Sequence, residues 1–436
     1  MKNYEKLLNW RNFKIRLIFE GIIVGLFVGI VISLFRFLVG KSEMYLNEIY
    51  MMLSLNHRLI PIWIALIAFL GYFIGLLIKR QPIIIGSGIP QVEGVILRKL
   101  HMNWYKVAAG KFIGSLVSIG SGLSMGIEGP SVQIGAALGQ GIGTLMKRTK
   151  IEIKYLVTSG VSAGISTAFN APVAGTMFAL EEVHKNFSPL VLVSALSSAL
   201  SSDFISREFF GMKPVFNFKN IVVLPLGYYP CIIILGIIIG AAGVGFSKVL
   251  LRTQAIYSKV GIKLELRPII PFVISAAVAF FLPQALGEGN TLIMLLTKTD
   301  WTFKILVVIL LVKFIFTMIS TGSGAPGGIF LPLFAVGAII GCIYGNVLVY
   351  FFNFKSIYIG SFVILAMAGY FSSVVKSPIT GTILVVEMTG SFNNLLPCAI
   401  MSITAYLISD ILNSKPIYQE LLDRLLNNNF KYQKRI

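Results

Sequence analysis

The feature that most constrains this chain is an internal duplication. Residues 111–143 align with residues 313–345 at a constant offset of 202 and without a gap, and 14 of the 33 positions are identical. Lys111, Gly126 and Pro130 are among the residues repeated in the second copy. Apolar segments rarely match by chance at Lys, Gly and Pro, so the pattern indicates two copies of one structural unit.

A second match continues the duplication at an offset of 206. It pairs four residues of each copy: Pro172, Gly175, Thr176 and Glu181 with Pro378, Gly381, Thr382 and Glu387. The acid shared by both copies indicates a structural role for Glu181. In contrast, Glu128 aligns with Phe330, and Glu182 aligns with Met388. An acid kept in only one copy suggests a functional site at the interface of the repeats.

Composition places the chain in a membrane. Of its 436 residues 56% are hydrophobic and 13% charged, with a mean hydropathy of +0.83, which leaves too little polar surface for a soluble globule. Besides the long apolar runs given below, several apolar segments are short and broken by Gly or Pro. Lipid tolerates such breaks only where protein covers the backbone. We therefore predict an all-α polytopic membrane protein. Six apolar runs are candidate spans or partial spans: Leu17–Phe35, Leu59–Leu77, Leu190–Leu200, Ile221–Phe246, Ile269–Leu282 and Ile305–Ile319.

The net charge of +19 would favour a nucleic-acid partner in a soluble protein. In a membrane protein, Lys and Arg instead flank the spans and mark cytoplasmic loops, so we expect no nucleic-acid partner. We predict a cell-membrane location, a basic surface helix over Met1–Arg16 and both termini in the cytoplasm. The basic residues that support this are Lys2, Lys6, Arg11, Lys14 and Arg16 at one end and Lys431, Lys434 and Arg435 at the other.

Metal, cofactor and covalent chemistry have no sequence signature here. Cys231, Cys342 and Cys398 lie in or beside apolar runs without ligand spacing, and we expect them to be free thiols. The three histidines are scattered through the chain. We therefore predict no metal site, no cofactor and no enzymatic activity.

Two glycine-rich motifs predict binding of an anion by helix N-termini. The first is Gly86-Ser87-Gly88-Ile89-Pro90, in which free amides and a hydroxyl open a helix; a simple turn with Ser as N-cap is the alternative. The second half carries Gly287-Glu288-Gly289 at a nearly matching offset.

The second motif occurs in both copies. Gly126-Ile127-Glu128-Gly129-Pro130 aligns with Gly328-Ile329-Phe330-Leu331-Pro332. Two broken helices that aim their positive ends at one point are typical of a transporter for an anion. A carboxylate at Glu128 can occupy the anion site as a tethered competitor and leave it when protonated, and it can also cap its own helix.

These motifs resemble the signatures GSGIP, G(K/R)EGP and GxFxP of the CLC family of chloride channels and chloride/proton antiporters. Lys415-Pro416-Ile417-Tyr418 resembles the family's segment that carries a pore tyrosine. The similarity runs from about residue 15 to about residue 425. It implies a bacterial-type homodimer whose protomers each contain two inverted repeats of tilted and re-entrant helices. The corresponding ranges are about 15–210 and 218–414, followed by a pore-lining helix at about 416–428.

The resemblance implies an anion site built from few groups. Ser87 and Tyr418 would donate hydroxyls, and the amides of Ile329 and Phe330 would complete the shell. Ser87 implies chloride, because nitrate-preferring members carry proline at that position. Only about 18 residues follow Tyr418, so we expect none of the paired cytoplasmic CBS domains of some members.

The resemblance also implies a proton route. Glu128 would be the gate and external proton acceptor, Glu182 the internal proton glutamate, and Glu181 the acid beside it. An acid at the inner position is typical of the family's antiporters, so we expect exchange of chloride for protons across the lipid bilayer. Ile127 departs from the family's basic residue. The alternatives are a passive chloride channel on this fold and, in another class, a membrane-embedded enzyme or an anion receptor.

Overall fold

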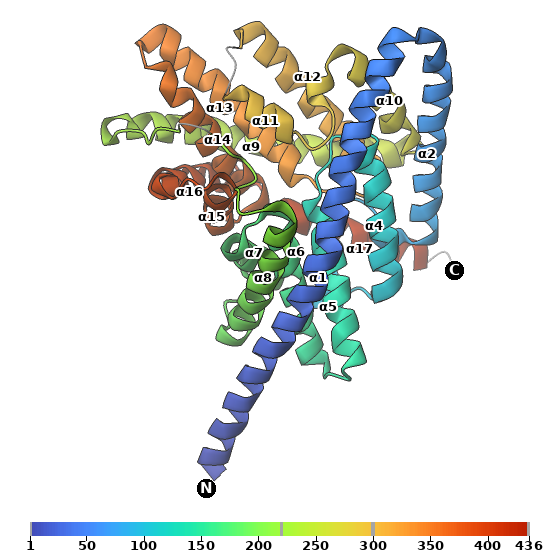
Figure 1. Cartoon of the computed structure of the whole chain (residues 1–436), viewed down its shortest axis with the longest axis vertical. Helices are drawn as coiled ribbons and strands as arrows, with labels where there is room; N and C mark the ends of the chain where they lie inside the picture. The colour runs from blue at the N-terminus through green and yellow to red at the C-terminus, as the bar shows by residue number, and fades with distance from the viewer. Residues whose placement is uncertain (1, 219–220, 298–300, 434–436) are drawn as a thin grey trace.

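The structure, a computed structural model, describes residues 2–218, 221–297 and 301–433, and is helical throughout these ranges apart from turns and connecting loops. Eight helices form the first half (Figure 1): α1 (Lys2–Leu55), α2 (Ile60–Arg80), α3 (Ile89–Ile96), α4 (Trp104–Gly120), α5 (Glu128–Leu145), α6 (Lys150–Phe169), α7 (Pro172–Phe178) and α8 (Pro189–Phe210). A π-helical turn, Ala179–His184, extends α7.

Eight helices in the same order form the second half. They are α9 (Tyr229–Lys259), α10 (Ile269–Phe281), α11 (Asn290–Leu296), α12 (Phe303–Gly322), α13 (Phe330–Phe352), α14 (Ile359–Val375), α15 (Pro378–Thr389) and α16 (Leu395–Ile411). The last helix, α17 (Ile417–Gln433), packs against α3 of the first half and α14 of the second.

Packing within the two halves is the same. Helix α1 lies on α8 as α9 lies on α16, and α5 lies on α6 as α13 lies on α14. Glycines permit the α5–α6 contact, because a Cβ atom on Gly135 would lie 2.1 Å from the carbonyl oxygen of Gly160. The predicted all-helical membrane fold with duplicated architecture is thus confirmed.

Eight helices of the described chain are long and apolar enough to cross a membrane. Four of the six predicted runs lie inside them, and the run from Ile269 forms the shorter helix α10. The run Ile221–Phe246 is wrong at its start, since residues 221–225 are not helical and Pro225 disfavours helix in the residue before it. The spans missed in the sequence are Phe330–Phe352, Ser356–Val375 and Phe392–Ile411.

The N-terminal segment also differs from expectation. Instead of a separate surface helix ending near Arg16, α1 continues without interruption from Lys2 to Leu55 and forms the long blue helix of Figure 1. No Pro or Gly stands between Lys2 and Glu20, so nothing in that stretch breaks the helical hydrogen-bond ladder.

Candidate anion and proton site

Two helix N-termini, one from each half, meet near the centre of the described chain. Helix α5 begins at Glu128 and α13 at Phe330, and the residues just before them pair with each other. The amide of Gly126 donates to the carbonyl of Gly328 at 3.0 Å, and the reverse bond measures 2.7 Å. The unpaired first amides of both helices are therefore held close together.

The Glu128 carboxyl crosses from its own helix to the other half. Its Oε1 accepts a hydrogen bond of 2.7 Å from the backbone amide of Phe330. The side chain is 0% exposed, and Oε2 has no hydrogen-bond partner among the described residues. An acidic side chain thus lies on a helix N-terminus, a position that favours anions.

Glycines make room for this carboxyl. A Cβ atom at Gly126 would fall 2.0 Å from Glu128 Oε2, and one at Gly328 would fall 1.8 Å from Oε1. Neither position tolerates a side chain while Glu128 keeps this place. The two glycines of the repeated motif therefore have a direct steric purpose at the site.

Ser87 lies in a loop that is bonded to the second half. The Gly86 amide donates to Gly324 O and the Gly327 amide donates to Gly86 O, each at 3.0 Å. Gly86 and Gly88 adopt φ angles of +62° and +94°, which favour glycine. Pro90 lies in the first turn of α3, and the Ser87 hydroxyl accepts from the Ile89 amide at 3.3 Å.

Two buried lysines hold equivalent loops in the two halves. Lys111 Nζ donates to Ile84 O at 3.0 Å and also to Gly86 O. Lys313 Nζ donates to Ala285 O at 3.1 Å and to Gly287 O at 2.7 Å. The sequence marked these lysines only as repeated residues. The structure makes them the anchors of the loops that contain Ser87 and Glu288.

Tyr418 is fully buried, and its hydroxyl has no partner among the described residues. Its ring lies 6.0 Å from the ring of Phe330, measured between centroids. The hydroxyl is also close enough to Glu128 and Glu182 to interact electrostatically with both. A donor without an acceptor at this place is suited to a bound anion.

Glu182 lies in the π-helical turn after α7 and is 3% exposed. Its Oε2 accepts a hydrogen bond of 2.9 Å from the hydroxyl of Ser377. Its Oε1 has no hydrogen-bond partner in the part of the chain described. Nearby, Lys185 forms an ion pair with Glu93 of α3. The carboxyl is thus buried with one neutral donor and one free oxygen.

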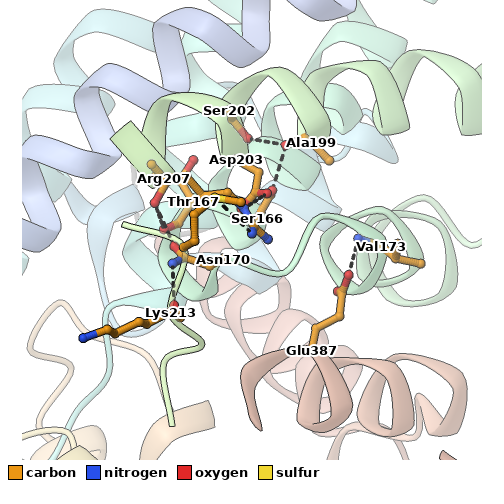
Figure 2. A network of polar contacts seen from close by, with 12 residues as sticks. Ser166, Thr167, Asn170, Val173, Ala199, Ser202, Asp203, Arg207, Lys213 and Glu387 are labelled. Atoms are coloured by element: carbon orange, nitrogen blue, oxygen red, sulfur yellow. Dashed lines mark hydrogen bonds and ion pairs between the residues drawn. The ribbon is translucent and has the colours of Figure 1, made fainter. Parts of the chain in front are cut away.

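Glu181 and Glu387 make the same contact in opposite directions. Glu181 accepts from the amides of Ile379 and Thr380 at the start of α15, at 3.3 and 2.8 Å. Figure 2 shows Glu387 of α15 directed at the start of α7, where it accepts from the Val173 amide at 3.2 Å. Each acid caps a helix of the other half, which is a structural task.

No group of three His, Cys, Asp or Glu residues suitable for a metal ion occurs in the described ranges. Cys231, Cys342 and Cys398 are free.

The structure brings Glu128, Phe330 and Tyr418 into one region. The amide of Ile329 directly precedes this region, because Ile329 is the residue before the first turn of α13.

The fold defines a polytopic membrane protein, and a candidate anion site lies where its two halves meet. Residues 70–410 match the family model described as voltage gated chloride channel, and the chain belongs to this family.

Relatives and solved structures agree with that assignment. The H(+)/Cl(-) exchange transporter ClcA of Yersinia pestis bv. Antiqua (strain Angola) is 34% identical over 83% of this chain and 77% of its own length. The same transporter of Vibrio campbellii (strain ATCC BAA-1116) is 32% identical over 94% and 90%. A slow cyanobacterial Cl-/H+ antiporter superposes with a TM-score of 0.90, 26% identity and coverage of 94% and 98%.

Proposed function

We propose that this protein is a secondary active transporter that exchanges chloride for protons. The observation that carries the proposal is the Glu128 carboxyl bound to the Phe330 amide. A site that accepts its own tethered carboxylate also accepts a free anion of the same charge. The relatives named as H(+)/Cl(-) exchange transporters support chloride and the proton as the two substrates.

Exchange follows from competition for one place. Chloride that approaches the Phe330 amide, with the hydroxyls of Ser87 and Tyr418 as further donors, displaces the Glu128 carboxylate. The displaced carboxylate, removed from its amide donor, becomes a better proton acceptor. Once protonated it is neutral and no longer competes for the anion site. Chloride and the carboxylate cannot occupy the site together, so movement of one is tied to movement of the other.

The inner end of the proton route is Glu182. Its free Oε1 and its burial beside Ser377 suit a group that takes a proton and releases it to the cytoplasm. Glu181 is a positioning residue, because its carboxylate fixes the start of α15 directly after Ser377. An idle Glu182 would be expected in a passive channel, and its buried, polar setting favours exchange.

The assembly in the membrane is part of the proposal. We take both termini to be cytoplasmic, with Glu128 responding to the external side, and two copies to form a homodimer. Many large apolar side chains are exposed on the single chain, including Phe19, Phe69 and Phe204. Lipid and a second copy are the surfaces that would cover them.

The experiment uses purified protein in sealed liposomes with a chloride gradient and a clamped voltage. Chloride flow is expected to drive protons against their own gradient, which a pH electrode outside the liposomes records. Chloride flux without proton movement would identify a channel. Absence of both fluxes would favour a receptor or an enzyme.

A further inference from the structure

A cavity of about 370 Å³ opens beside the two paired helix N-termini. We call it the vestibule. It is lined by α1, by the residues just before α5 and by the loop before α11, and it reaches Leu331 of α13. Its charged and polar lining residues are Arg36, Lys41, Glu43, Glu288 and Asn290, and Ile127 completes the wall next to Glu128.

Glu288 is one of the two acids of the vestibule that the exchange mechanism does not use. It is 4% exposed, and its Oε2 accepts a hydrogen bond of 2.7 Å from the side-chain amide of Asn290. Its Oε1 has no hydrogen-bond partner in the described ranges. The carboxyl lies near the backbone amide of Ile127 and within electrostatic range of Glu128. It is therefore a buried, half-satisfied acid next to the gate.

A second carboxyl, that of Glu43 on α1, lies against the same loop. Glu43 Oε1 would lie 2.8 Å from a Cβ atom built on Gly287, and the Glu43 carboxyl lies beside the backbone of Glu288. Glu43 is half-buried, and its charge repels that of the buried Glu288, so Glu288 holds a proton more readily. The charged groups that face Glu288 are Glu43 and Arg36 of α1, Glu128 of α5 and Lys313 of α12.

Arg36 forms the cationic wall of the vestibule. It donates to Asn170 Oδ1 at 2.8 Å and to Thr167 O at 3.2 Å, and it interacts electrostatically with Asp203 and Glu288. Figure 2 shows Asn170 at the end of α6, near the ion pair formed by Asp203 and Arg207 of α8. Fixed cations at Arg36 and Lys313 disfavour a metal cation between the two acids, which leaves the proton as the fitting ligand.

The duplication explains where Glu288 stands. Gly287 and Gly289 have φ angles of +59° and +99°, nearly those of Gly86 and Gly88. The same kind of lysine anchors both loops. Glu288 is thus the counterpart of Ser87 in the second half. In an inverted repeat the two counterparts approach the central site from opposite sides, so Glu288 approaches Glu128 from the side away from Ser87.

We propose that Glu288, supported by Glu43, is an outer proton-binding residue that passes protons from the vestibule to Glu128. A proton from water in the vestibule binds the Glu288 carboxylate. It then leaves for the Glu128 carboxylate, directly or through one water, and Glu288 becomes a carboxylate again. No other bond changes. This proposal rests on the proposed exchange of chloride for protons and adds the route by which external protons reach the gate.

The test measures proton-coupled chloride transport of the full chain in liposomes at a series of external pH values. For Glu288→Gln, which keeps an acceptor for Asn290, we expect about tenfold slower transport at neutral external pH. The difference is expected to disappear near an external pH about two units lower, where protons reach Glu128 without a relay. The number of protons moved per chloride stays that of wild type. Glu48→Gln, an exposed acid on α1, is the control and keeps the wild-type profile.

A purely structural Glu288 would give a different result, namely a rate lowered by one factor at every pH or not changed at all. That result overturns the proposal while wild-type proton pumping still supports exchange. Wild-type protein that moves no protons overturns both. Glu43→Gln provides an independent variant, because loss of its charge weakens proton binding by Glu288 and shifts the profile about half a pH unit toward acid. An unshifted Glu43→Gln profile contradicts the proposal even where Glu288→Gln does not fold.

Discussion

A carboxyl group can lie on the Phe330 amide because the two residues facing it have no side chains. Gly126 and Gly328 pair through their backbones, and a methyl group on either would overlap the Glu128 oxygens. The acid is therefore placed by its neighbours rather than by its own rotamer alone. Its second oxygen has no partner among the described residues, which makes displacement by a free anion less costly.

Replacement of Glu128 by Gln keeps the size of the side chain and removes its charge and its ability to carry a proton. Coupled proton transport is expected to fall at least tenfold. Chloride flux is expected to continue and to lose its dependence on pH. The measurement is external pH in liposomes under a chloride gradient. Chloride-driven proton movement retained by Glu128→Gln would contradict the role given to Glu128.

Ser87 tests the identity of the anion. Its amide donates no hydrogen bond in the described chain, so Pro at this position costs no backbone bond but removes the hydroxyl. We expect Ser87→Pro to increase nitrate transport relative to chloride transport about threefold or more, since chloride, the smaller of the two anions, depends more on a close donor. Relative fluxes of the two anions in liposomes measure this. An unchanged ratio means that Ser87 does not contact the anion.

Among the helices, the reciprocal caps join the two halves. Glu181 of the turn after α7 caps α15, and Glu387 of α15 caps α7. The sequence predicted a structural role from the matching acids but could not name their partners. The partners depend on how α7 and α15 lie against each other, which no local pattern encodes.

Glu181→Ala and Glu387→Ala form a matched pair, because both remove the same kind of helix cap. Each is expected to lower stability by about 1–2 kcal/mol, measured as thermal unfolding in detergent. Both are expected to retain the wild-type ratio of protons to chloride. A changed ratio in Glu181→Ala alone would instead place Glu181 in the proton route.

Other elements show the limits of prediction from sequence in physical terms. Helix-breaking glycines and prolines located the N-termini of α3, α5 and α13 correctly, because these signals are local. The spans α13 and α14 were missed because Gly and Ser interrupt their hydrophobic runs, yet most of each helix is buried in protein rather than lipid. The lysine anchors were missed because their carbonyl partners lie 25–28 residues away in the chain.

Across the whole molecule, the proposed exchange needs Glu128 and Glu182 to act in sequence although they belong to different helices. The Tyr418 hydroxyl interacts electrostatically with both. The charged groups that interact with Glu182 are Lys185, Glu93 and Glu181. Water that enters this region transiently is the fitting carrier between Glu128 and Glu182.

Glu182→Gln separates the two fluxes at this scale. The amide keeps an acceptor for Ser377, so the fold and the anion site are expected to remain. Proton flux is expected to fall at least tenfold, because the inner relay cannot bind a proton, while chloride flux persists. Parallel recordings of chloride and pH in the same liposomes measure both. Equal loss of the two fluxes would mean that Glu182 supports structure only.

The reciprocal caps of Glu181 and Glu387 also bear on ancestry. In these contacts a residue of one half touches the other half, and its repeat counterpart makes the same contact in reverse. Contacts of this kind are those of a two-fold symmetric dimer. A half-length ancestor that paired with itself would have made both caps with one gene. Such a pair must carry identical residues on both sides of its axis. Within one polypeptide that requirement is absent, and Glu128 opposite Phe330 and Glu288 opposite Ser87 are differences that a half-length chain paired with itself could not carry.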